Sequence, residues 1–189
     1  MRNTADRADP PSQKAAKAPE MQVWTGEQLA RFLTLVDGDR YRAPLLFLAM
    51  TGCRRGEALG LRWNDVDFDE RVVRIRLQLT SVGHVVAIKP RTKSDKPRVV
   101  ELDGVTIAML KTWRAQQSHE RLLMGPGYDD GGLVFCHADG RRYDPEKFSR
   151  ASDRILGKRA FAIELPRIRL HDLRHTWGDS RFGRRRATL

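Results

Sequence analysis

Four side chains in three separated segments of the chain could act together on a phosphate group. Arg54 stands at an expected helix start, and Glu57, three residues later, can orient its guanidinium. Lys93 lies in a turn between two expected strands, and His171 and Arg174 are spaced to share one helical face. Guanidinium groups grip the non-bridging oxygens of a phosphate, while lysine and histidine transfer protons. The set therefore predicts chemistry at a phosphate.

The same segments argue against a metal centre. No acidic pair able to hold Mg²⁺ accompanies the cationic side chains. These side chains would themselves neutralise the negative charge at the phosphate, as a metal ion does in other enzymes. His171 and His175 have the spacing of the zinc-binding motif His-Glu-x-x-His, and Asp172 stands where that motif has its glutamate. We reject a zinc site because aspartate is not glutamate, Arg174 would bring a cation to the metal, and no third ligand is evident. We expect neither a metal nor a cofactor.

Helical periodicity predicts the elements that position these groups. Thr25 and Gln28 form a capping box at the start of the first helix. Asp144 and Pro145 are a helix cap followed by a proline at the first helical position. The expected helices cover residues 25–38, a segment around 45–49, and residues 55–61, 105–123, 144–156 and 171 onward.

Between the third and fourth helices the apolar period changes to that of strands. Alternating apolar residues predict three short strands over residues 72–79, 85–88 and 99–102, separated by Gly83 and by the segment 90–97. We therefore expect an α+β fold that is mostly helical, with a small three-stranded antiparallel sheet.

Composition and charge restrict the possible partners. The 189 residues suit one domain, and the net charge is +11. From Arg154 onward there are ten Lys or Arg against three acidic residues, the electrostatic footprint of a polyanion such as double-stranded DNA. No apolar run is long enough to span a membrane, and two cysteines provide no disulfide framework. We expect a cytoplasmic, DNA-associated protein.

At this point the chain resembles a known family, the tyrosine recombinases or phage integrases. The stretch TGCRRGEALGLRWNDVDFDE is similar to the family's first arginine box, and HDLRHTW is similar to its His-x-x-Arg-His box. The likeness covers roughly Val23 to Trp177, with the expected sheet between the two boxes. The resemblance implies a bacterial or phage-encoded catalytic domain that cuts and joins DNA strands at specific sites during integration or excision of a mobile element.

The resemblance also implies a role for each residue. Arg54 and Arg174 would clamp the scissile phosphate, His171 would assist proton transfer, and Lys93 would protonate the leaving 5′ oxygen. Lys89, Arg91 and Lys96 lie close to Lys93, and the alignment of the following segment, 98–102, favours Lys93. Glu57 and His175 would support the site.

The chain departs from the family at both ends. Family members begin with a separate helical DNA-gripping domain and end with a nucleophilic tyrosine, whereas Tyr41, Tyr128 and Tyr143 all precede the His-x-x-Arg-His box. We expect a disordered arm over residues 1–20, an incomplete catalytic domain over 21–177 and an aberrant basic tail over 178–189. Without an attacking hydroxyl this chain would be inactive in cutting.

Three further hypotheses follow from these departures. The tail lacks the apolar period of a packed helix, and we interpret it as a frameshift product or a diverged end. The chain could instead be a non-catalytic DNA-binding module or regulator. Alternatively, other recombinase subunits could supply the tyrosine in trans.

Overall fold

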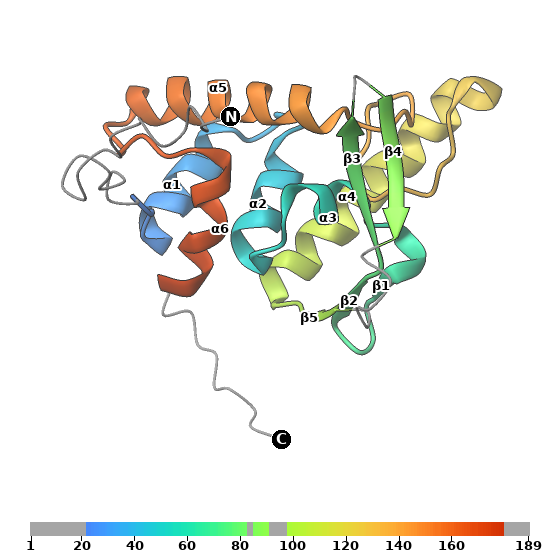
Figure 1. The fold of residues 1–189 in the computed structure, drawn as a ribbon, viewed down its shortest axis with the longest axis horizontal. Helices are drawn as coiled ribbons and strands as arrows, with labels where there is room; N and C mark the ends of the chain where they lie inside the picture. Colours follow the sequence, from blue (N-terminus) through green and yellow to red (C-terminus); the bar gives the residue numbers. More distant parts are fainter. Residues whose placement is uncertain (1–21, 83–84, 91–97, 180–189) are drawn as a thin grey trace, which may run out of the picture.

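The computed structural model describes residues 22–82, 85–90 and 98–179 (Figure 1). The expected arm over 1–20, the tail beyond Asp179 and Lys93 lie outside the described residues. The helices are α1 (Gly26–Leu35), α2 (Arg42–Thr51), α3 (Arg55–Leu59), α4 (Gly104–Met124), α5 (Pro145–Ala162) and α6 (Leu170–Asp179), with single 3-10 turns η2 (Trp63–Asp65) and η3 (Gly125–Gly127). The mixed, mostly helical fold class is confirmed, and no helix in the described ranges is long and apolar enough to cross a membrane.

The predicted helix starts are confirmed by their hydrogen bonds. The backbone N–H of Gln28 donates to Thr25 Oγ1, and the backbone N–H of Thr25 donates to Gln28 Oε1, so the capping box before α1 is complete. Asp144 accepts hydrogen bonds from the backbone N–H groups of Glu146 and Lys147 at the start of α5. Each cap satisfies backbone donors that have no partner inside the helix.

The strands differ in part from the prediction. A three-stranded antiparallel sheet is present, ordered β1 (Val66–Asp67), β2 (Val72–Ile75) and β5 (Arg98–Glu101). A separate hairpin contains β3 (Leu77–Val82) and β4 (Val85–Pro90). The expected strand over 72–79 is therefore two strands interrupted at Arg76, whose Nε lies 3.3 Å from Asp65 Oδ1. Alternation continues across that break, so hydropathy alone could not reveal it.

Helix α2 lies at the centre of the core and is buried on nearly every side. It packs against α6, α4 and α3, and Figure 1 shows α6 running beside it. Leu173 of α6 and Leu45 and Phe47 of α2 are fully buried. The end of the chain that contains His171 and Arg174 is thereby fixed next to the helix that leads into Arg54.

Two glycines allow α3 to approach strand β3 very closely. A Cβ atom on Gly56 would lie 2.6 Å from the backbone oxygen of Leu79, and one on Gly60 would lie 3.0 Å from the Cα atom of Gln78. Neither position has room for a side chain without movement of the backbone. The short helix that follows Arg54 is therefore anchored against the hairpin.

Candidate active site

Arg54 is placed by a sharp end to helix α2. Gly52 adopts a left-handed conformation with φ of 61°, and its N–H donates to the carbonyl of Leu48. A residue with a Cβ atom is disfavoured in that conformation, so glycine suits this helix end. The chain then extends through Arg54 and enters α3.

Glu57 holds Arg54 in the way the spacing predicts. Its side chain is only 1% exposed, and its Oε1 lies 3.3 Å from Arg54 Nη1. Its Oε2 accepts a hydrogen bond of 2.9 Å from the backbone N–H of Arg54. The Arg54 side chain is 61% exposed, so a buried carboxylate orients a guanidinium that faces the solvent.

The structure adds a cation that sequence reasoning did not include. Arg98, the first residue of β5, places Nη1 3.7 Å from Glu57 Oε2. Its position in the sequence, directly after the segment that contains Lys93, was the available signal. Only the folded structure shows that it reaches the same carboxylate as Arg54.

Helix α6 presents the second group of predicted residues. Asp153 and Asp172 accept hydrogen bonds from the backbone N–H groups of Leu170 and Arg169, which fixes the start of the helix. His171 is exposed and His175 is half-buried, and their ring centroids are 5.7 Å apart in an edge-on arrangement.

The thiol of Cys53 connects the two groups. Cys53 is buried beside Arg54, and burial raises the pKa of its thiol, while a hydrogen bond with Thr51 and the charges of Arg98 and Arg174 act to lower it. Arg174 and Arg98 are therefore close enough to act on the same buried atom. Helix α6, which contains Arg174, also packs on α2, which leads through Gly52 and Cys53 to Arg54.

Lys93 stays a prediction because it lies outside the described residues. The segment that contains it connects Pro90, at the end of β4, to Arg98, at the start of β5. In the described part of the chain, no group of three His, Cys, Asp or Glu side chains is placed to hold a metal ion.

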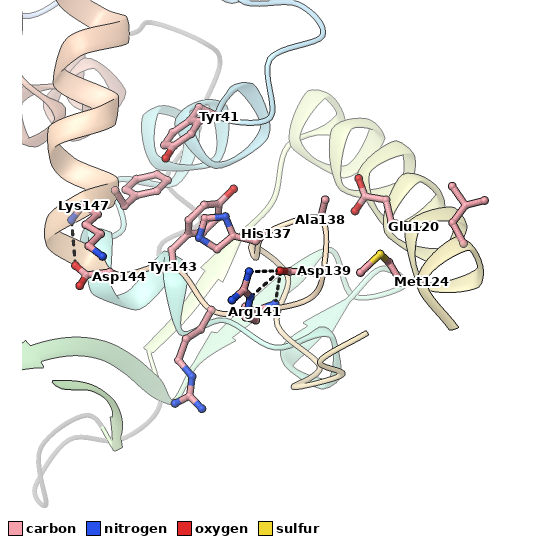
Figure 2. A pocket seen from close by; sticks show the side chains of 13 residues that line it. Tyr41, Glu120, Met124, His137, Ala138, Asp139, Arg141, Tyr143, Asp144 and Lys147 are labelled. Atoms are coloured by element: carbon pink, nitrogen blue, oxygen red, sulfur yellow. Dashed lines mark hydrogen bonds and ion pairs between the residues drawn. The ribbon is translucent and has the colours of Figure 1, made fainter. Parts of the chain in front are cut away.

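A separate hollow lies near the start of α5 and contains none of the predicted site residues (Figure 2). Its volume is about 720 Å³, and Tyr41, His137 and Tyr143 contribute aromatic walls. Its acidic groups already have partners, since Asp139 accepts from Arg141 and Asp144 caps α5. Burial raises the pKa of the Tyr143 hydroxyl, the opposite of what a nucleophile needs.

The sequence pattern of the Phage integrase family matches residues 22–180, which is most of the chain. The chain belongs to the phage integrase family. This finding confirms the resemblance that the arginine box and the His-x-x-Arg-His box indicated.

Individual relatives agree with this assignment. The chain is 28% identical over 178 residues to a protein named "Tyrosine recombinase XerC-like" of Caldanaerobacter subterraneus, covering 87% of this chain and 44% of that protein. It is 26% identical to the "ICEBs1 integrase" of Bacillus subtilis, covering 83% of this chain and 42% of the relative. The chain therefore spans less than half the length of these curated relatives.

Solved structures show the same fold. The Tn1549 transposon integrase in complex with transposon right end DNA aligns with a TM-score of 0.71 at 21% identity, over 85% of this chain and 53% of that one. The XerA recombinase aligns with a TM-score of 0.61 at 23% identity, over 85% of this chain and 50% of that one. The fold of most of this chain is thus a known one.

Proposed function

We propose that this domain binds double-stranded DNA for site-specific recombination of a mobile element, with Arg54 and Arg174 on one backbone phosphate. The observation that carries the proposal is that Arg54 and Arg98 share the buried Glu57 carboxylate, while α6, which contains Arg174, packs on the helix that leads to Arg54. Guanidinium groups bind the oxygens of a phosphodiester, and the Arg54 side chain is 61% exposed. The relatives named as integrases and the DNA-bound Tn1549 integrase support this partner.

In this proposal His171 and Lys93 handle protons. His171 is exposed on the same helix as Arg174 and assists proton transfer at the phosphate. Lys93 protonates the 5′ oxygen that leaves when a tyrosine hydroxyl attacks the phosphorus. His175 supports His171 from its position one helical turn later.

The nucleophile is the part of the reaction that these residues do not supply. Tyr41 and Tyr143 line the hollow beside α5, and burial raises the pKa of Tyr128. We therefore propose that these 189 residues bind DNA without forming a covalent phosphotyrosine bond by themselves. Cutting then requires a tyrosine hydroxyl that these residues do not supply.

Fluorescence anisotropy with a labelled duplex of about 20 base pairs tests the phosphate-binding role. Arg54→Ala and Arg174→Ala are each expected to weaken binding about fivefold and to reduce the salt dependence by about one counterion. Arg121→Ala is the matched control, because the Arg121 side chain on α4 is as exposed as that of Arg54. Equal affinities for all four proteins would refute the assignment of the phosphate to Arg54 and Arg174.

A nicked duplex that traps covalent intermediates tests the reaction. We expect no protein–DNA adduct after denaturing electrophoresis of this chain alone, although the DNA is bound. An adduct formed by this chain alone would refute the need for an external tyrosine. If a mixture with a tyrosine-bearing recombinase forms an adduct that Arg54→Ala abolishes, subunit complementation is supported over a purely non-catalytic module.

A further inference from the structure

One buried carboxylate serves two guanidinium groups that come from different elements. Glu57 Oε1 faces Arg54 Nη1 at 3.3 Å, and Glu57 Oε2 faces Arg98 Nη1 at 3.7 Å. Glu57 is 1% exposed, whereas the Arg98 side chain is 35% exposed. The arrangement therefore carries a net positive charge around a shielded negative one.

We propose that Arg98 is a positioning residue, which shares Glu57 with Arg54 and so keeps the Arg54 guanidinium directed outward to a DNA phosphate. This inference rests on the proposed function, in which Arg54 binds the phosphate. Arg98 acts through Glu57 and need not touch DNA.

The argument begins with the demands of a buried carboxylate. A carboxylate removed from water requires close cations and hydrogen bonds, and an arginine satisfies it best by a bidentate contact to both oxygens. Arg54 does not make that contact, since its side chain reaches Oε1 while Oε2 is occupied by the Arg54 backbone N–H and faces Arg98. Sharing the carboxylate keeps the Arg54 side chain from closing over both oxygens.

The consequence for Arg54 follows from its remaining donors. An arginine has five N–H donors in a planar fork. In the described part of the chain, its guanidinium makes one side-chain hydrogen bond, through Nη1 to Glu57, and its side chain is 61% exposed. The other donors can therefore meet the oxygens of a phosphate.

The backbone explains why Arg98 can hold this position. Strand register pairs Arg98 with Ile75 of β2, which is fully buried. Helix α3 is held against β3 by the close approach at Gly56. The two cations are thus mounted on elements that are each fixed by packing, with Glu57 between them.

A double-mutant cycle in DNA binding tests the proposal, with the labelled duplex as probe. Arg98→Met keeps the apolar stem but removes the charge, and we expect about fivefold weaker binding. In the Arg54→Ala background the same change should have no further effect, because Arg98 acts through Arg54. If the double variant instead loses DNA affinity by the product of the two single-variant factors, Arg98 contributes independently of Arg54, and the proposal is overturned.

Residue-specific NMR separates positioning from a general structural role. Titration with inorganic phosphate should shift the Nε–Hε signal of Arg54 in the unaltered protein, and Arg98→Met should diminish that shift. Arg98→Lys restores a cation at this position and should recover DNA affinity to within about twofold. An undiminished shift in Arg98→Met, or Arg98→Lys as weak as Arg98→Met, would overturn the proposal.

Arg76→Met is the matched control. Arg76 is also a partly exposed arginine that faces a buried carboxylate, with Nε 3.3 Å from Asp65 Oδ1. Arg76→Met should leave the phosphate-induced shift of the Arg54 signal unchanged. A diminished shift in Arg76→Met would overturn the specific role of Arg98. Loss of the fold of Arg98→Met at low temperature, seen by circular dichroism, would also overturn it. If Arg54→Ala alone binds DNA with unchanged affinity, the proposed function fails. If the single-variant losses in affinity multiply in the double variant, only the role of Arg98 fails.

Discussion

Replacing Gly56 by alanine tests how firmly helix α3 is held against the hairpin. The new Cβ atom would lie 2.6 Å from the backbone oxygen of Leu79, whereas ordinary contacts begin at 3.4 Å. Because that oxygen belongs to the backbone of β3, no side-chain rotation can relieve the clash. The helix or the strand must move by most of an ångström.

Two opposing effects set the magnitude. Overpacking of this kind costs about 1–3 kcal/mol. Alanine has a higher helix propensity than glycine, which offsets up to about 1 kcal/mol. We expect a net loss of roughly 1–2 kcal/mol in the free energy of unfolding, and a fall in Tm of roughly 2–8 °C for a chain of this size.

Thermal denaturation followed by circular dichroism measures the change. Gly157→Ala is the matched control, since Gly157 lies inside α5 and an added Cβ atom meets no atom within 4 Å. That variant should have a higher Tm because only the propensity term applies. An equal increase in Gly56→Ala would refute the close packing of α3. At temperatures where both variants are folded, Gly56→Ala should also bind DNA more weakly, because the shift displaces Arg54.

Three other predictions concern the scaffold. Burial acts to raise the pKa of Glu120, but hydrogen bonds from Arg40 and Gln116 hold it below its ordinary value of 4.5. The ionised carboxylate therefore stabilises the folded state above about pH 4.5, and this stabilisation is lost as the pH falls. Between about pH 5 and pH 3, the free energy of unfolding measured in urea should fall less in Glu120→Gln than in the unaltered protein. Thr25→Ala removes the cap of α1 and should cost about 1 kcal/mol in the same assay, and an unchanged midpoint would contradict the capping box. Leu173→Ala should lower the free energy of unfolding by about 2–5 kcal/mol in chemical denaturation, because Leu173 of α6 is fully buried in the core. A loss of less than about 1 kcal/mol would contradict that burial.

Much of the fold could be predicted because its signals are local. The capping box at Thr25 and the Asp144–Pro145 helix start depend on side chains that bond to backbone atoms two or three residues away. The pairing of Glu57 with Arg54 is likewise a contact across one helical turn. Such contacts are encoded in spacing, so the sequence is sufficient to predict them.

The remaining features depend on contacts between distant segments. Arg98 reaches Glu57 only in the folded chain, and no spacing rule connects two residues 41 positions apart. Arg76, where the strand is interrupted, lies beside Asp65 of η2, with its Nε 3.3 Å from Oδ1. Alternating hydropathy across residues 72–79 is the same for one strand or two, so tertiary contacts decide.

The contacts of helix α1 and of Trp24, which precedes it, have a consequence for synthesis of the chain on the ribosome. Trp24 Nε1 donates to the carbonyl of Pro166, 142 residues later, and Arg31 donates to the carbonyl of Ile163. A helix whose partners emerge so late cannot complete its packing during most of translation. The start of the described chain therefore acquires its final contacts only after the residues near Ile163 and Pro166 have been synthesised.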